Sequence, residues 1–214
     1  MKKSMRNFLA GGIYAILSEE HSNGRSNLEV AEKLLEAGIT VIQYREKDKK
    51  AGAMYDECLT LREMTRSAKA TFIINDHVDL ALLVDADGVH VGQEDLPPAA
   101  VRKLLGPDRI IGLSTHGPSQ ARAAQTSGVV DYIGVGPIFA TKTKKDVCDP
   151  VGFEYLDYVV EHIPMPFVAI GGIKTHNLPQ VRERGAHMAC LVTEIVGADD
   201  ISGTARNLRN MMKA

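Results

Sequence analysis

Residues 132–146, YIGVGPIFATKTKKD, carry the pattern on which the fold of this chain depends. The run YIGVG (132–136) is typical of a short buried strand, and the loop after it carries two threonine hydroxyls and several lysines. A loop of this kind at the end of a parallel strand is suited to hold phosphate. Four more clusters follow apolar runs in the same way: QYREK (43–47), ND (75–76), QED (93–95) and AIGG (169–172). Five such clusters at five strand ends predict one shared site.

Short β-branched runs alternate with helical patterns along the whole chain, which is typical of βα units and a parallel sheet. The predicted strands are IYAIL (13–17), TVIQY (40–44), TFIIN (71–75), GVHV (88–91), RIIGL (109–113), YIGVG (132–136), FVAI (167–170) and MACLV (188–192). Eight units of about 27 residues favour an α/β fold, the single-domain (β/α)8 TIM barrel, near its lower size limit. An open doubly wound sheet is disfavoured, because no Gly-x-Gly-x-x-Gly follows the first strand.

The composition is that of one compact domain, with 214 residues of which 44% are hydrophobic and 24% charged. We expect a single domain over 1–214, with residues 1–11 as a short N-terminal extension. The formal net charge of -2 provides no global basic field for nucleic acid. Three cysteines, Cys58, Cys148 and Cys190, stand in no metal-ligand spacing, so they indicate buried thiols in a reducing compartment.

The start of the chain loosely resembles a secretory signal, because Lys2, Lys3 and Arg6 precede an apolar run at 8–17. No small-residue cleavage pattern follows, so we expect residues 13–17 to be a buried strand and the protein to be cytoplasmic. No apolar segment approaches the length of a membrane span, so we expect no membrane partner.

Gln43, Arg45 and Lys47 follow the second predicted strand at alternate positions, so in an extended backbone their side chains project to one side. Two cations and an amide together suit a polyphosphate, because arginine binds phosphate oxygens bidentately and lysine adds a compact charge. The alternative is a surface strand end whose cations pair with Glu46 and Asp48.

Asn75 and Asp76 end the third predicted strand, and Asp95 follows the fourth after His90 and Gly92. Mg²⁺ usually takes one or two carboxylates, waters and substrate phosphate oxygens, which two aspartates on neighbouring strands can supply. Helix capping is the alternative for Asn75 and Asp95. The run DADG (85–88) lacks the later ligands of a calcium loop and is predicted to be a turn.

Ser114 and His116 lie just beyond the fifth predicted strand, where a hydroxyl can donate to a heterocycle or phosphate and a histidine can transfer protons. No feature supplies a partner that makes Ser114 a nucleophile. His77 and His90 are expected to pack or hydrogen-bond locally. Barrels often bind phosphate with the loops after the last two strands, so the loop residues there predict a second anion site. A tight turn is the alternative for Gly171 and Gly172.

Seven motifs together closely resemble the thiamine phosphate synthase family, in order and over nearly the whole chain. They are QYREK (43–47), INDHVDLAL (74–82), GVHVGQEDLP (88–97), GLSTH (112–116), DYIGVGPIFATKTKKD (131–146), AIGGI (169–173) and LVTEI (191–195). The resemblance implies a barrel-shaped transferase that joins a hydroxymethylpyrimidine diphosphate to a thiazole phosphate, forming thiamine phosphate and releasing diphosphate. It also implies that diphosphate departs with the help of Mg²⁺ and that the thiazole nitrogen traps a pyrimidine methylene cation.

The resemblance also implies roles for individual residues. Pyrimidine diphosphate would be bound by Gln43, Tyr44, Arg45, Glu46, Lys47, Asn75, Ser114 and Lys144, of which Arg45, Lys47, Ser114 and Lys144 would be catalytic. Thiazole phosphate would be bound by Thr141, Lys142, Thr143, Gly172, Val192 and Thr193. Asp76 and Asp95 would hold the Mg²⁺. The chain departs from the family pattern at Ser18-Glu19, where a Thr-Asp pair is usual, and at Thr193, where serine is usual.

Two other functions stay open at this point. A thiazole tautomerase of the same superfamily shares the barrel and a histidine matching His116, but it lacks the metal aspartates and the Thr-x-Thr-Lys loop. A non-catalytic barrel that binds a phosphorylated ligand to regulate a partner is the other alternative. For all three functions the expected ligands are small molecules, and a homo-oligomer is compatible with each.

Overall fold

The computed structural model describes residues 5–143 and 148–213, and it confirms the predicted barrel. Eight parallel strands close in sequence order, so that β1 pairs with both β2 and β8. The strands are β1 (Gly12–Leu17), β2 (Val41–Tyr44), β3 (Thr71–Asn75), β4 (Gly88–Val91), β5 (Ile110–Thr115), β6 (Tyr132–Val135), β7 (Phe167–Ile170) and β8 (Met188–Leu191). Their boundaries differ by at most two residues from the predicted ones, the largest difference being at β5, which includes Ser114 and Thr115.

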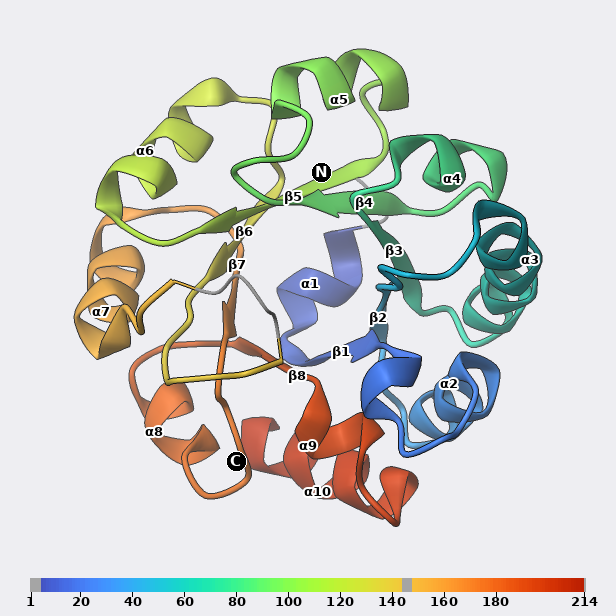
Figure 1. Cartoon of the computed structure of the whole chain (residues 1–214). Coiled ribbons are helices and arrows are strands. Elements are labelled where there is room, and N and C mark those ends of the chain that lie inside the picture. Colours follow the sequence, from blue (N-terminus) through green and yellow to red (C-terminus); the bar gives the residue numbers. More distant parts are fainter. Residues whose placement is uncertain (1–4, 144–147, 214) are drawn as a thin grey trace.

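The helices after the first strand form a ring outside the strands, as Figure 1 shows in a view along the barrel. The α-helices are α1 (Arg6–Ala10), α2 (Asn27–Glu36), α3 (Ala51–Ser67), α4 (Val78–Leu83), α5 (Pro98–Leu105), α6 (Pro118–Ser127), α7 (Gly152–His162), α8 (Leu178–Glu183), α9 (Thr193–Val196) and α10 (Ile201–Lys213). A short 3₁₀ turn, η2 (Glu19–His21), follows β1. No helix in the described part of the chain is long and apolar enough to cross a membrane.

Side chains alternate between the two faces of each strand, and this produces two cores. In β1, Ile13, Ala15 and Leu17 belong to the large core between strands and helices. Tyr14 and Ile16 belong to a smaller core that includes inward-facing residues of the barrel. The position of a residue in a strand therefore decides whether it can reach the cavity.

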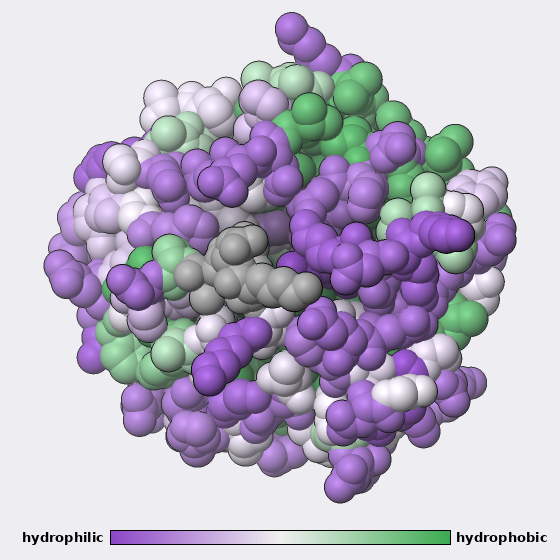
Figure 2. All heavy atoms as spheres, viewed as in Figure 1, coloured by the Kyte–Doolittle hydropathy of each residue, from purple (hydrophilic) through white to green (hydrophobic). Residues whose placement is uncertain are grey.

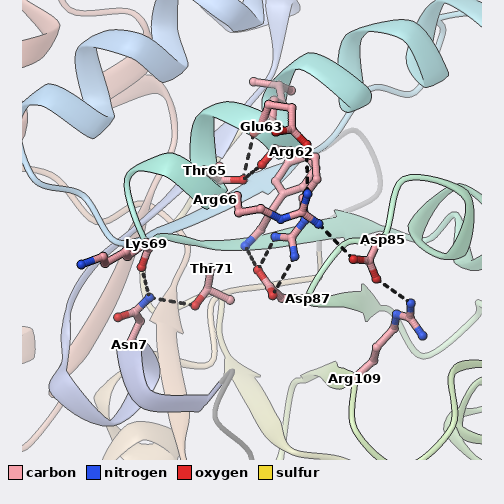
Figure 3. Close-up of polar contacts among 12 residues, drawn as sticks. Asn7, Arg62, Glu63, Thr65, Arg66, Lys69, Thr71, Asp85, Asp87 and Arg109 are labelled. Carbon is pink, nitrogen blue, oxygen red and sulfur yellow. Dashed lines mark hydrogen bonds and ion pairs between the residues drawn. The ribbon is translucent and has the colours of Figure 1, made fainter.

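Helix α1 closes the N-terminal end of the barrel. Residues 1–11 were predicted only to be a short N-terminal extension, with no helix in it. Helix α1 lies behind the ring of strands in Figure 1. Phe8 is 5% exposed, and its ring centroid lies 4.4 Å from that of Tyr132. Asn7 fixes the helix, because its Nδ2 donates to Thr71 Oγ1 at 3.0 Å and to the carbonyl of Lys69 at 3.1 Å (Figure 3).

Ion pairs hold the turn at 85–88. Arg62 binds Asp87 with both terminal nitrogens, at 2.9 and 3.3 Å, and Asp87 also accepts the backbone N–H of Phe72 at 2.8 Å. Asp85 pairs with Arg66 at 3.0 Å and with Arg109 at 2.9 Å (Figure 3). These contacts tie α3 to the starts of β3, β4 and β5 and hold the predicted turn in place.

The prediction that the cysteines are buried thiols is correct for two of them and wrong for the third. Cys58 and Cys190 are buried, and burial raises the pKa of both thiols. Cys148 is exposed, because it lies in the loop after β6 and outside both cores. Spacing in the sequence carries no information about which loop residues the core covers.

Candidate active site

A cavity opens at the C-terminal ends of the strands, on the face where Figure 2 shows hydrophilic side chains around the centre. Most of the predicted site residues line it: Gln43, Arg45, Lys47, Asn75, Asp76, Asp95, Ser114, Thr141, Thr143, Gly172, Val192 and Thr193, together with His116. Lys144, predicted to be catalytic, lies outside the described residues.

Three predicted contact residues have side chains that do not line this cavity. Tyr44 is buried on the outer face of β2, where its hydroxyl donates to Glu57 at 2.6 Å. The carboxylate of Glu46 accepts the backbone N–H of Glu19 at 2.8 Å and the amide of Asn27 at 2.8 Å. Lys142 is exposed beside the cavity-lining Thr141. The reason is the two-residue period: Gln43, Arg45 and Lys47 share one side, so Tyr44 and Glu46 face the other.

The departure from the family pattern after β1 has a structural counterpart in this outer network. Lys49 pairs with Glu19 at 2.9 Å and with Glu57 at 2.8 Å, and Glu57 also accepts the hydroxyl of Tyr44. Burial raises the pKa of Glu19, but the hydrogen bond and charge of Lys49 outweigh it and leave that pKa lowered. Glu19 therefore helps to join the loops after β1 and β2.

A cluster of charged groups lies at the ends of β2, β3 and β4. The Lys47 ammonium pairs with the carboxylate of Asp76, and the carboxyl of Asp95 lies close enough to that of Asp76 to affect its pKa. Asp95 also accepts the backbone N–H of Gly92 at 2.7 Å. Burial raises the pKa of Asp76, the Asp95 carboxyl raises it further, and Lys47 opposes both. Among the described residues, none forms a hydrogen bond or ion pair with the guanidinium of Arg45.

The two aspartates fit a divalent cation that also binds a ligand. Within residues 5–143 and 148–213, no three His, Cys, Asp or Glu side chains come together to hold a metal ion. Two adjacent carboxylates, one with a raised pKa, repel each other when ionised, and a cation relieves that repulsion. Mg²⁺ characteristically binds through one or two carboxylates and completes its shell with water and phosphate oxygens.

A second cluster lies across the closed barrel, at the ends of β7 and β8. The ammonium of Lys174 donates to Thr193 Oγ1 at 2.8 Å and pairs with Glu194 at 3.3 Å. Thr141 donates its hydroxyl to that of Thr143 at 3.1 Å on the neighbouring loop. Lys174 is not among the predicted site residues, although its place two residues after Gly172 indicates the same strand end.

Gly172 is required by the geometry of this second cluster. Its φ is +62°, in the left-handed region that glycine adopts without strain. A Cβ at this position would lie 2.6 Å from the carbonyl oxygen of Ala140 and 2.8 Å from the Cβ of Phe139. The close approach of the loop after β6 therefore explains the glycine better than a tight turn alone.

The inner part of the cavity carries polar side chains that are not among the predicted site residues. Tyr14, Tyr132 and His90 line it together with Gln43 and Ser114. His90 was expected to pack or hydrogen-bond locally, but its ring bonds to Tyr132 and Ser114, 42 and 24 residues away in the chain. All three missed residues occupy inward-facing positions of their strands, which the alternation in the sequence could have identified.

His116 also lines the cavity, and the backbone carbonyl of Gly136 fixes the tautomer of its ring. Nδ1 lies 2.6 Å from the carbonyl oxygen of Gly136. Because a carbonyl only accepts, Nδ1 carries the proton, and Nε2 is unprotonated in the neutral ring.

Comparisons with known proteins show which family this chain is similar to. The model of the family described as thiamine monophosphate synthase matches residues 13–195. The thiamine-phosphate synthase of Pelotomaculum thermopropionicum is 64% identical over 208 residues, covering 97% of this chain and 95% of the relative. That of Lawsonia intracellularis is 54% identical over 201 residues, covering 94% and 92%.

A solved structure extends the similarity to three dimensions. Thiamine phosphate pyrophosphorylase from Pyrococcus furiosus superimposes with a TM-score of 0.88 at 34% identity, and the alignment covers 98% of each chain. The family match spans more than half of the chain, and the relatives are similar over nearly their full lengths. The chain therefore belongs to the thiamine monophosphate synthase family of transferases.

Proposed function

We propose that this protein joins 4-amino-2-methyl-5-hydroxymethylpyrimidine diphosphate to a thiazole phosphate, giving thiamine phosphate and diphosphate. The observation that carries the proposal is the pair of polar clusters on opposite sides of one cavity: Arg45, Lys47, Asp76 and Asp95 on one side, Lys174 and Thr193 on the other. Two anionic substrates need two such clusters. Between them lies the uncharged Ser114, where the reacting carbon and nitrogen would meet.

The first cluster would bind the diphosphate. The guanidinium of Arg45 is available to grip phosphate oxygens, and Lys47 and Lys144 would add positive charge. Asp76 and Asp95 would hold Mg²⁺, whose contribution when bound is to neutralise charge on the departing diphosphate. Gln43, Asn75 and Ser114 would orient the pyrimidine.

The second cluster would bind the phosphate of the thiazole. The backbone N–H of Gly172, the hydroxyls of Thr141, Thr143 and Thr193, and the ammonium of Lys174 are its donors, with Val192 beside them. This anchoring would aim the thiazole nitrogen at the pyrimidine methylene carbon.

The reaction is a substitution at that carbon. The carbon–oxygen bond breaks with its electron pair leaving on diphosphate, and the thiazole nitrogen supplies the pair for the new carbon–nitrogen bond. Cations around the departing oxygens stabilise the charge that develops there, so no protein nucleophile is required.

Purified protein incubated with both substrates and Mg²⁺ should form thiamine phosphate and diphosphate in equal amounts. Isomerisation of a thiazole without coupling would identify the tautomerase, and binding without turnover would identify a regulator. We further propose that residues 1–214 act as one cytoplasmic domain on small molecules, with residues 1–11 as its N-terminal extension.

A further inference from the structure

A chain of hydrogen bonds crosses the inner end of the cavity. Gln43 Nε2 donates to the hydroxyl of Tyr14 at 2.8 Å, and that hydroxyl lies 3.0 Å from the hydroxyl of Tyr132. Tyr132 lies 2.8 Å from Nδ1 of His90, whose Nε2 lies 2.9 Å from Ser114 Oγ. The chain thus connects two residues that the proposed function assigns to the pyrimidine.

The available protons give this chain a direction. Burial raises the pKa of Tyr14 and of Tyr132, so each phenol keeps one proton to donate. The amide nitrogen of Gln43 can only donate, so the Tyr14 hydroxyl accepts a hydrogen bond from it. The Tyr14 hydroxyl then donates its own hydrogen bond to the hydroxyl of Tyr132. Tyr132 in turn donates to Nδ1 of His90, which must then be unprotonated.

This direction of the hydrogen bonds decides which group donates between His90 and Ser114. A neutral imidazole with an unprotonated Nδ1 carries its proton on Nε2, so His90 donates to Ser114 Oγ. The hydroxyl proton of Ser114 is then directed away from His90. In the reverse order, Tyr14 would accept from both Gln43 and Tyr132, and its own proton would have no acceptor within the chain. A buried donor without an acceptor is unfavourable, so the first direction is preferred.

The surrounding backbone leaves room for these groups. A Cβ on Gly112 of β5 would overlap the hydroxyl of Tyr132 and Nδ1 of His90. Gly112 does not have a positive φ, so its backbone conformation does not require glycine. Glycine is needed here because a Cβ would occupy the space of these two side chains. The ring of Phe8 packs against the two tyrosines of this hydrogen-bonded series. Its centroid lies 4.4 Å from that of Tyr132 and 5.9 Å from that of Tyr14.

We propose that Tyr132 is a positioning residue that sets the tautomer of His90 and so makes Ser114 a hydrogen-bond donor to an acceptor atom of the pyrimidine ring. The inference rests on the proposed function only for the identity of the ligand. The direction of the hydrogen bonds follows from the residues themselves.

Removing the Tyr132 hydroxyl tests the proposal by kinetics. Tyr132→Phe should lower kcat/KM for the pyrimidine diphosphate about tenfold, the size expected for one hydrogen bond, and leave KM for the thiazole phosphate unchanged. Tyr155→Phe is a matched control, because that buried hydroxyl donates to Thr115 at 2.7 Å outside the cavity. Equal losses in the two variants, or none in Tyr132→Phe, would overturn the proposal.

A double mutant separates positioning from a general structural effect. If Tyr132 acts through Ser114, then Tyr132→Phe should cause no further loss in protein that already carries Ser114→Ala. Losses that multiply would show that the two residues act independently and would refute the proposed role.

The tautomer itself can be measured without any substrate. Nitrogen NMR of the wild-type protein at a pH where His90 is neutral should show a proton on Nε2, and Tyr132→Phe and Gly112→Ala should shift the population toward Nδ1. A wild-type ring protonated on Nδ1 would overturn the inference. This readout distinguishes the two proposals, because absence of thiamine phosphate formation by the wild type would defeat the proposed function and leave the tautomer result intact.

Discussion

At the residue scale, two arginines carry the same charge but have different roles, one in stability and one in ligand binding. The guanidinium of Arg62 binds Asp87 bidentately near the base of the barrel, whereas that of Arg45 lines the cavity with no partner among the described residues. We predict that Arg45→Ala weakens binding of the pyrimidine diphosphate and lowers turnover, with an unchanged melting temperature. Arg62→Ala should do the reverse, lowering the free energy of unfolding by about 2 to 3 kcal/mol, because it removes charged hydrogen bonds. Thermal melts and steady-state kinetics on both variants check this, and a destabilised Arg45→Ala with normal kinetics would contradict it.

The aspartate pair supports a second prediction at the residue scale. Asp76→Asn and Asp95→Asn each leave the diphosphate charge less well neutralised in the transition state. We expect kcat/KM to fall at least about a hundredfold, equivalent to roughly 2.7 kcal/mol. Added Mg²⁺ should restore part of the activity, and EDTA should abolish that of the wild type until Mg²⁺ is returned. Asp157→Asn is the control, because this carboxylate pairs with Arg184 on the surface. Full activity in metal-free buffer would exclude the metal-assisted mechanism.

At the scale of elements, α1 stabilises the barrel through one face. Phe8 is 5% exposed and packs against Tyr14 and Tyr132, whereas the adjacent Leu9 is 53% exposed. We predict that Phe8→Ala lowers the free energy of unfolding by about 3 to 5 kcal/mol, the usual range for a buried phenylalanine. Leu9→Ala should change it by at most about 0.5 kcal/mol, as surface substitutions usually do. Denaturant titration of both variants measures the difference, and similar values for the two would show that α1 does not seal the barrel.

At the scale of the whole molecule, hydrogen-bonded glutamates make stability depend on pH. Burial raises the pKa of Glu194, but hydrogen bonds from Thr175 and Lys174 outweigh it and leave that pKa lowered. Hydrogen bonds from Ser26 likewise lower the pKa of Glu29, which completes the capping box of α2. Because these groups titrate at lower pH in the folded state, their stabilising contribution is present above the ordinary glutamate pKa and is lost as the pH falls through the folded value.

We therefore predict that the free energy of unfolding decreases as the pH is lowered below about 4.3, the ordinary value for glutamate. Glu194→Gln should make that decrease shallower, whereas Glu32→Gln, at an exposed position, should leave its slope unchanged. Asp76 acts in the opposite sense, because its pKa is raised in the folded protein. Urea titrations at several pH values measure the slope, and an unaltered slope in Glu194→Gln would contradict the assignment.

The sequence by itself determined the barrel and the outline of its site. Eight strands with a two-residue period and helices between them are local patterns, and they imply a closed parallel sheet whose strand ends meet. Side chains such as Arg45, Lys47, Asn75 and Asp76 could therefore be assigned to one cavity from their positions alone. The same period separates Gln43 and Arg45 from Tyr44, whose side chain is buried on the other face of β2.

Only the tertiary structure decided which distant residues meet. Tyr14 and Tyr132 are 118 residues apart in sequence and share a hydrogen bond, because closing the sheet turns both side chains toward the barrel axis. Closure of the sheet also brings Lys174 within hydrogen-bond distance of Thr193 and places Tyr132 where Phe8 packs against it. Periodicity specifies the face of a strand on which a side chain lies. The partner that it meets there depends on strand order, register and packing, which involve the whole chain at once.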